Sequence, residues 1–180
     1  IEPRLQGLRV AELGGFLGEL ELGLGDGERR VGGLARCRRW RERQRLALDL
    51  NDEERRVLLE HGTERPFCGA FVDQKQPGIY GCRLCGLPLF EATEKFNSGT
   101  GWPSFTAPYH PDHLTEIRDR SYGMVRTEIR CARCGSHQGH VFPDGPPPTG
   151  QRYCINSISL QFTPAGHALP DPLRRGDTTA

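Results

Sequence analysis

Two Cys-x-x-Cys-Gly units constrain the fold of this chain more than any other feature of its sequence. The first spans residues 82–86 and the second spans residues 131–135. Thiolates two residues apart in a tight turn can bind one tetrahedral cation, and glycine after the second cysteine permits a positive φ there. We therefore predict one closed, structural zinc site. Its ligands would be Cys82, Cys85, Cys131 and Cys134.

The cysteine count supports this interpretation. The chain has seven cysteines, and in a reducing compartment such a number indicates metal binding or catalysis rather than a disulfide framework. The alternatives are two redox-active pairs, unrelated core thiols, or iron in place of zinc. The two units match in kind, in the glycine that follows and in the strand predicted before each, which favours zinc. Such an ion would join two distant hairpins and contribute folding energy rather than chemistry.

Length and charge exclude several classes of protein. A chain of 180 residues favours one domain with a core of its own. The net charge of +1 produces no global field toward nucleic acid or membranes. No apolar run reaches the length of a membrane span, and the start lacks a secretory signal pattern. We therefore expect a cytoplasmic location, with no membrane or nucleic-acid partner.

The two ends of the chain differ in composition from its middle. Residues 1–48 are expected to form an irregular extension, because glycines interleaved with leucines over residues 17–25 disfavour a helix. The arginine-rich run at residues 36–43 contains Cys37 and allows a nucleic-acid-binding arm as the alternative. The catalytic domain is predicted over residues 49–166. An irregular tail is expected over residues 167–180.

Local signals predict a helix and a half-buried strand. Asn51 and Glu54 have the spacing of a reciprocal capping box, and Gly62 can close the helix that they begin. Val125, Thr127 and Ile129 alternate with charged residues, which is typical of a strand that is buried on one face.

Other segments are predicted less directly. We expect a hairpin with one strand over residues 67–72, a turn near residues 76–78 and a second strand at residues 79–80. Cys68 would then lie in its first strand. A short helix is expected over residues 111–120.

The stretch from Arg152 to Phe162 resembles a strand that carries a functional thiol. Apolar residues recur at every second position through Ile158, Leu160 and Phe162. That period predicts Cys154 on the same face as the apolar set, with Asn156 beside it. A nearby Arg152 would lower the pKa of the thiol, and the thiolate is the reactive form. The alternative is that Cys154 is a small buried apolar residue.

Polar residues upstream of this strand offer acid–base chemistry. With four cysteines assigned to a metal, Cys37, Cys68 and Cys154 remain. His137 and His140 flank a glycine, and imidazoles can donate protons near neutral pH. Asp144 could orient a histidine, and Asn156 could hold a polar atom of a substrate.

Five motifs together resemble one family. They are Cys-Arg-Leu-Cys-Gly at 82–86, Ser-Gly-Thr-Gly-Trp-Pro-Ser-Phe at 98–105, Cys-Ala-Arg-Cys-Gly at 131–135, His-Gln-Gly-His-Val-Phe-Pro-Asp-Gly at 137–145 and Arg-Tyr-Cys-Ile-Asn-Ser at 152–157. Their kind and order are similar to those of the B-type methionine sulfoxide reductases. The resemblance covers about residues 50–163.

This resemblance implies an all-β fold with two antiparallel sheets, sandwich-like, preceded by short helices. It implies reduction of the R epimer of methionine sulfoxide, in proteins or as the free amino acid. Cys154 matches the nucleophile of the family, and Trp102 matches the aromatic residue that packs on the substrate methyl group. The positions implied to orient or protonate the sulfoxide oxygen and to support the thiolate are His137, His140, Asp144, Arg152 and Asn156.

The chain departs from the family pattern at Thr100, where many members carry a second cysteine that resolves the sulfenic acid. Some members instead carry a cysteine in an early Pro-Phe-Cys-Gly segment, so the resemblance favours Cys68 in that role over Cys37. It also implies thioredoxin as the reductant. The rival hypotheses are a zinc-stapled binding module and a general thiol peroxidase or disulfide reductase.

Overall fold

The computed structural model describes residues 41–172, and its N-terminal part is helical. Residues 41–46 form α-helix, and the 3₁₀ turn η1 (Ala47–Asp49) follows. The expectation of an irregular segment up to residue 48 is therefore wrong for residues 41–48. The reason is apolar packing, because Leu46, Ala47 and Leu50 join the core cluster. Cys37 and the rest of residues 1–40 lie outside the described residues, as do residues 173–180.

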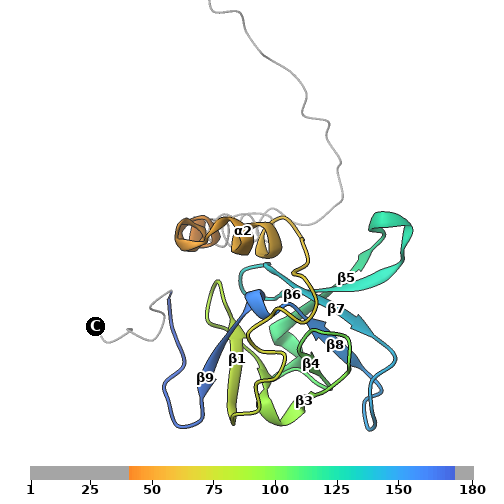
Figure 1. Cartoon of the computed structure of the whole chain (residues 1–180). Helices are drawn as coiled ribbons and strands as arrows, with labels where there is room; N and C mark the ends of the chain where they lie inside the picture. The colour runs from red at the N-terminus through yellow and green to blue at the C-terminus, as the bar shows by residue number, and fades with distance from the viewer. Residues whose placement is uncertain (1–40, 173–180) are drawn as a thin grey trace, which may run out of the picture.

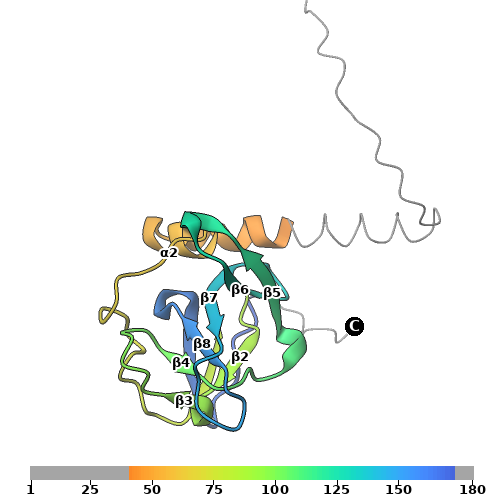
Figure 2. The same ribbon diagram turned by 90° about the vertical axis from the view of Figure 1, so that its right-hand side faces the viewer.

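Helix α2 (Asp52–Leu58) has the predicted capping box. The side chain of Asn51 accepts from the Glu54 backbone N–H, and the Glu54 side chain accepts from the Asn51 N–H. At the other end His61 has φ +60°, and the N–H of Gly62 donates to the carbonyl of Arg56. The helix is thus closed by a left-handed residue just before the glycine. It lies across one end of the two sheets (Figure 1 and Figure 2).

In the part of the chain that the structure describes, nine strands form two antiparallel sheets, which confirms the predicted fold class. The smaller sheet has the order β2-β1-β9, with β1 (Gly78–Cys82), β2 (Pro88–Glu91) and β9 (Leu160–Pro164). The larger has the order β3-β4-β8-β7-β6-β5. Its strands are β3 (Lys95–Phe96), β4 (Ser104–Phe105), β5 (Leu114–Asp119), β6 (Arg126–Cys131), β7 (His137–Phe142) and β8 (Arg152–Ile155).

Aromatic and aliphatic side chains from both sheets share one core. Tyr80 of the small sheet packs edge-on against Phe105 of the large sheet, and Phe90 stacks on Phe105. Ile129 and Ile155 are fully buried in the same cluster. Within residues 41–172, no helix is long and apolar enough to cross a membrane.

Two predicted elements are absent from residues 41–172. Residues 67–77 form turns and bends rather than a strand, because β1 already has partners on both sides in β2 and β9. Cys68 therefore lies in a loop. The predicted helix over residues 111–120 is instead the 3₁₀ turn η3 (Pro111–His113) followed by β5, which pairs with β6 over its whole length.

The strand predicted to run through Cys154 is interrupted. β8 ends at Ile155, the 3₁₀ turn η5 (Ser157–Ser159) follows, and β9 then joins the other sheet. The carboxylate of Glu64 accepts the backbone N–H groups of Ser157 and Ile158, which cannot then pair with a strand. The chain thus passes from the larger sheet to the smaller one directly after β8, the strand that contains Cys154.

Candidate active site and metal centre

The four cysteines of the two Cys-x-x-Cys-Gly units meet at one end of the sheets. Cys82 ends β1 and Cys131 ends β6, and all four side chains are buried. The sulfur atoms lie within 4.8 Å of one another, with Cys82–Cys134 and Cys85–Cys131 distances of 3.6 and 3.5 Å. The four cysteines therefore cluster as the sequence predicted, and the structure adds that they join the smaller sheet to the larger one.

The surroundings of these sulfurs fit a tetrahedral metal ion. Gly86 and Gly135 have φ values of +72° and +73°, and each donates its N–H to the carbonyl of the first cysteine of its unit at 2.8 Å. The Ser136 hydroxyl lies 3.3 Å from the sulfur of Cys82 and 3.1 Å from that of Cys134. Four thiols at such separations match the all-thiolate coordination that structural zinc prefers.

Cys154 lies in β8, between β4 and β7. Its Cα pairs with Ser104 on one side and with His140 on the other. Ile155 is fully buried in the core, and Tyr153 packs against the same core. Because side chains alternate along a strand, Cys154 faces away from the core. The prediction that Cys154 shares a face with the apolar set is therefore wrong, and the reason is the break at Ser157–Ser159.

A pocket of about 120 Å³ surrounds the Cys154 side chain. Trp102 and Phe142 supply aromatic walls, while His140 and Asn156 supply polar groups. Thr63, Arg126, Gly139 and Ile155 complete the lining. The structure thus brings together Cys154, Trp102, His140 and Asn156, which are distant in the sequence.

The indole of Trp102 is held from a loop that precedes the sheets. Its Nε1–H donates to the carbonyl of Glu64 at 3.2 Å. The backbone N–H of Glu64 donates to Oδ1 of Asn156 at 3.0 Å, and Nδ2 of Asn156 donates to the carbonyl of Gln138 at 3.1 Å. Glu64 was not among the residues predicted for the site, because it lies in a segment without periodicity.

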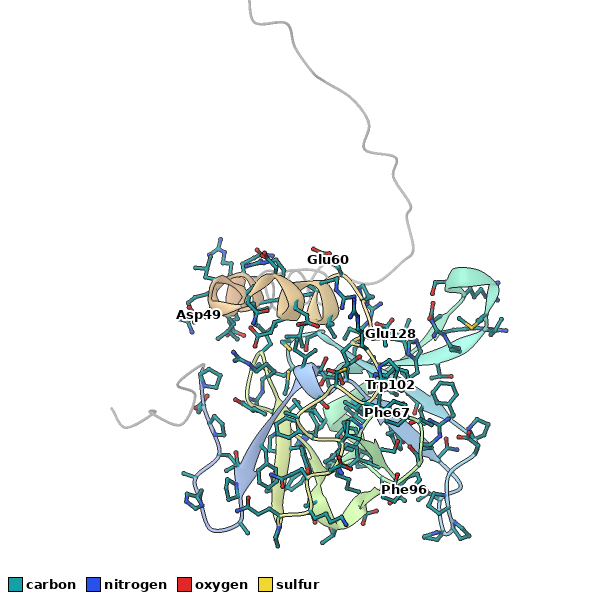
Figure 3. The ribbon with its side chains drawn as sticks, viewed as in Figure 1. Asp49, Glu60, Phe67, Phe96, Trp102 and Glu128 are labelled. Atoms are coloured by element: carbon teal, nitrogen blue, oxygen red, sulfur yellow. The ribbon has the colours of Figure 1, made fainter. Side chains whose placement is uncertain are left out.

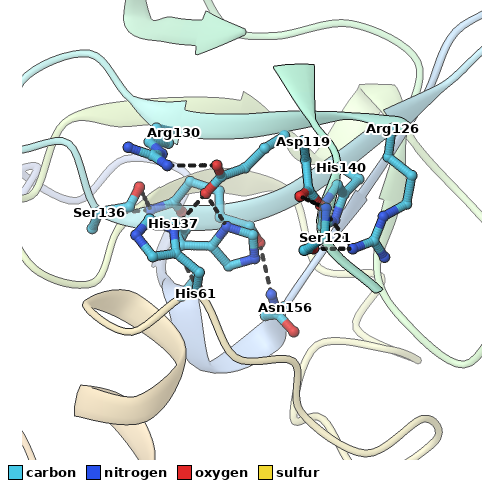
Figure 4. Close-up of polar contacts among 12 residues, drawn as sticks. His61, Asp119, Ser121, Arg126, Arg130, Ser136, His137, His140 and Asn156 are labelled. Carbon is cyan, nitrogen blue, oxygen red and sulfur yellow. Dashed lines mark hydrogen bonds and ion pairs between the residues drawn. The ribbon is translucent and has the colours of Figure 1, made fainter. Parts of the chain in front are cut away.

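His140 is held by a carboxylate that the sequence analysis did not identify. Its Nε2 lies 3.0 Å from Oδ2 of Asp119, which also accepts from Arg126 at 2.7 Å (Figure 4). Burial lowers the pKa of His140, and the hydrogen bond with Asp119 acts in the opposite direction. The Asp119 contact leaves Nδ1 as the nitrogen of His140 that can exchange a proton with a substrate.

His137 belongs to a second network, centred on Glu128. The Oε1 atom of Glu128 lies 2.7 Å from Nδ1 of both His137 and His61, and Oε2 accepts from Arg130 at 2.7 Å (Figure 4). Burial lowers the pKa of His137 to about 4. Although burial opposes its ionisation, hydrogen bonds from Arg130 and both histidines lower the pKa of Glu128 to about 2.

The alternation of charged residues around Glu128 was visible in the sequence but was open to two interpretations. Arg126, Glu128 and Arg130 alternate with the apolar residues of β6, so they resembled a solvated face. In the structure Glu128 pairs with His140 across the sheet. These charged residues line a polar cavity of about 630 Å³ that adjoins the Cys154 pocket and shares Thr63, Arg126 and His140 with it.

Asp144 pairs with Arg152 rather than with an imidazole. Nε and Nη2 of Arg152 donate to the two carboxylate oxygens at 2.8 and 2.9 Å, and the guanidinium lies 4.5 Å from the centre of the Phe142 ring. Burial raises the pKa of the Cys154 thiol, while Thr100 and the charge of Arg152 act in the opposite direction. Arg152 thus lowers the pKa of Cys154 as predicted, but burial has the larger effect and the net shift is upward.

Thr100 and Cys68 lie in two different loops. The hydroxyl of Thr100 lies 3.9 Å from the sulfur of Cys154. Cys68 is exposed and lines a separate depression with Ser157 and Ile158. The preceding residue, Phe67, donates its backbone N–H to the carbonyl of Gly101 at 2.7 Å, so the Cys68 loop lies against the loop that carries Thr100.

A half-buried thiol in a narrow pocket, with an indole wall and an imidazole held by a carboxylate, is an arrangement typical of enzymes that use a reactive cysteine. The SelR domain family matches residues 50–164 of the chain. The match covers most of the chain, including the four clustered cysteines and the residues that line the Cys154 pocket. The chain therefore belongs to the SelR family of B-type methionine sulfoxide reductases, as its motifs predicted.

Individual relatives are similar over the same region. Peptide methionine sulfoxide reductase MsrB of Caulobacter vibrioides is 69% identical over 136 residues, which cover 76% of this chain and 86% of the relative. The protein of that name from Xylella fastidiosa is 62% identical over 138 residues, covering 77% and 89%. The one from Pseudomonas putida is 56% identical over 115 residues, covering 64% and 88%.

Proposed function

We propose that this chain reduces the R epimer of methionine sulfoxide, in proteins or as the free amino acid, with Cys154 as the nucleophile. Membership of the SelR family and the names of the relatives support methionine sulfoxide reduction. The observation that carries the assignment to Cys154 is its shared pocket with Trp102 and His140.

The pocket suits the end of an oxidised methionine side chain. Trp102 and Phe142 offer apolar surface for the methyl group, and His140 and Asn156 offer polar groups for the sulfoxide oxygen. In the proposed first step, the Cys154 thiolate attacks the sulfoxide sulfur while protonated His140 delivers a proton to the oxygen. The S–O bond of the substrate and the transient bond between the two sulfurs then break as the hydroxyl passes to the sulfur of Cys154, which becomes a sulfenic acid, and methionine leaves reduced by two electrons.

The remaining site residues support this step indirectly. Asp119 stabilises the protonated form of His140, and Glu128 holds His137. Asp144 orients Arg152, whose charge favours the Cys154 thiolate. His137, Asp144 and Arg152 are thus positioning residues in this proposal, whereas Cys154, His140, Trp102 and Asn156 contact the substrate.

Regeneration needs a second thiol. In the proposed sequence the Cys68 thiol attacks the Cys154 sulfenic acid, a disulfide forms and water leaves. An external dithiol, which the family resemblance identifies as thioredoxin, then reduces the disulfide by exchange. The contact between the Cys68 loop and the Thr100 loop supports this route. Loop movement is required, because Cys68 and Cys154 line different depressions.

The proposal includes structural zinc and a reducing, cytoplasmic compartment. Cys82, Cys85, Cys131 and Cys134 would hold zinc, which when bound supplies folding energy and no chemistry. The reducing compartment follows from the use of these thiols as ligands, since an oxidising one would favour disulfides.

The decisive experiment compares the two sulfoxide epimers with dithiothreitol as reductant. The wild-type protein should consume the R epimer, and Cys154→Ser should abolish this while zinc content stays unchanged. Cys68→Ser should keep turnover with dithiothreitol and lose turnover with thioredoxin. Retained turnover in Cys154→Ser would refute the nucleophile. Equal consumption of peroxide or of simple disulfides would favour the rival peroxidase or disulfide reductase.

A further inference from the structure

Phe67 is a large apolar side chain that the proposed reaction does not use. It is 70% exposed, and its backbone has a left-handed φ of +64°. Bulky residues rarely adopt this conformation, because Cβ then crowds the backbone. Strained residues of this kind persist where the surrounding structure holds them, and they concentrate at functional sites.

The loop that carries Trp102 holds Phe67 in this position. The N–H of Phe67 donates to the carbonyl of Gly101, the residue before Trp102, at 2.7 Å. A Cβ on Gly101 would lie 2.8 Å from the Phe67 nitrogen and 2.9 Å from Cδ2 of its ring. The phenyl ring is thus packed directly on Gly101, the residue before Trp102, and both side chains are labelled in Figure 3. Its position relative to the Cys154 pocket is therefore set by backbone contacts.

The size of the Cys154 pocket determines which part of a substrate can contact the Phe67 ring. A volume of about 120 Å³ accommodates the end of a methionine sulfoxide side chain but not the rest of a polypeptide. The neighbouring residues of a substrate must then lie outside the pocket, and the loop of Thr100 and Trp102 is one of the surfaces next to them, because Trp102 lines the pocket. On that loop they meet an exposed phenyl ring, which favours apolar side chains.

We propose that Phe67 contacts an apolar side chain adjacent to methionine sulfoxide in a polypeptide substrate, so that the enzyme selects sulfoxides with apolar neighbours. This inference rests on the proposed function. The contact would be made in the ground state and in the transition state alike, so its loss should raise KM more than it lowers kcat. Phe67 is thus a specificity-determining residue rather than a catalytic one.

The test uses two blocked peptides, with methionine-R-sulfoxide between two leucines in one and between two serines in the other. Dithiothreitol is the reductant, so any contribution of Phe67 to docking of a reductant protein near Cys68 is excluded. The wild-type protein should prefer the leucine peptide by about tenfold in kcat/KM, the ratio expected when part of a phenyl ring is buried.

Four variants make the result specific. Phe67→Ala should bring the ratio close to one, and Phe67→Gly should do the same while accepting the left-handed φ without strain. Phe67→Leu should keep most of the preference. Tyr109→Ala removes another exposed aromatic side chain, one that stacks on His113, and should leave the ratio unchanged.

Two results would overturn the inference: no preference in the wild-type protein, or a ratio that stays unchanged in Phe67→Ala and Phe67→Gly, including the case where both peptides lose activity equally. In each of these cases the proposed function would stand, because the sulfoxide is still reduced. Failure of the wild-type protein to reduce either peptide would instead refute the proposed function.

Discussion

Nε2 of His140 lies 3.0 Å from Oδ2 of Asp119, although strand β6 separates the two strands that carry these residues. The same oxygen of Asp119 also accepts a hydrogen bond from Arg126. It therefore holds both His140, the proposed proton donor, and Arg126, which lines the Cys154 pocket. This contact makes Asp119 part of the proposed chemistry.

We predict that Asp119→Asn lowers kcat by about tenfold to a hundredfold, because a neutral amide stabilises the protonated imidazole less. Burial already lowers the pKa of His140 and Asp119 opposes that shift. The limb of the pH–rate profile that requires protonated His140 should therefore move to lower pH. Asp119→Glu should restore part of the rate. An unmoved limb with an unchanged melting temperature would contradict the role of Asp119.

The 3.9 Å contact between Thr100 and Cys154 leads to a gain-of-function prediction. In a Cys68→Ser background, Thr100→Cys should supply a resolving thiol within reach of Cys154 and restore thioredoxin-dependent turnover. A disulfide between residues 100 and 154 should be found by peptide mapping after one turnover. Thr106→Cys, on the neighbouring loop, is the matched control. Absence of that disulfide would show that the two side chains do not face each other as described.

The reactivity of Cys154 should follow its pKa. Since burial raises that pKa and Arg152 opposes the rise, Arg152→Met should move it further upward. The rate of alkylation at Cys154, followed by mass spectrometry against pH, measures this directly. Arg118→Met, on an exposed position of β5, should leave the midpoint unchanged. A downward movement in Arg152→Met would contradict the proposed support of the thiolate.

Acid should destabilise the fold in part through His137. Because burial lowers its folded-state pKa from 6.5 to about 4, the unfolded chain binds a proton that the folded chain excludes over that range. The free energy of unfolding should therefore fall as pH decreases from about 6.5 to about 4, by up to about 1.4 kcal/mol per pH unit for one proton.

His137→Gln removes this titration but leaves the cysteine cluster intact, so any loss of metal at low pH affects both proteins alike. The difference in slope between them, from denaturant unfolding at several pH values, isolates His137. Equal slopes would mean that His137 is not held neutral. Glu128 contributes separately, because its pKa is lowered to about 2 and its stabilisation is lost only below about pH 4.5.

Removal of the proposed zinc ion should unfold the protein rather than merely inhibit it. The four cysteines join the ends of the two sheets, so a chelator, or Cys131→Ser, should cost several kcal/mol of unfolding free energy. Zinc analysis and thermal melting measured together check this. Cys154→Ser should change neither quantity. An apo protein that melts like the wild type would contradict the structural role of the cluster.

The sequence was sufficient wherever a feature depends on residues close together in the chain. Cys82 and Cys85 lie in one turn that can hold a metal ion, and Asn51 and Glu54 form one capping box, whatever lies beyond them. The resemblance of ordered motifs extended this to the family and the fold class. Distances of two or three residues are set by local backbone geometry, which is why such spacings are informative.

Tertiary structure decided which face of each strand is buried. Glu128 resembled a solvent-exposed charge in an alternating strand, and Asp119 lay in a segment predicted to be helical; only the pairing of β5, β6 and β7 directs both carboxylates to the histidines. The face of Cys154 likewise depends on the turn after Ile155, which Glu64 holds from a distant loop. A period of two specifies that side chains alternate but not which side is buried, because burial depends on the partner that packs against each face.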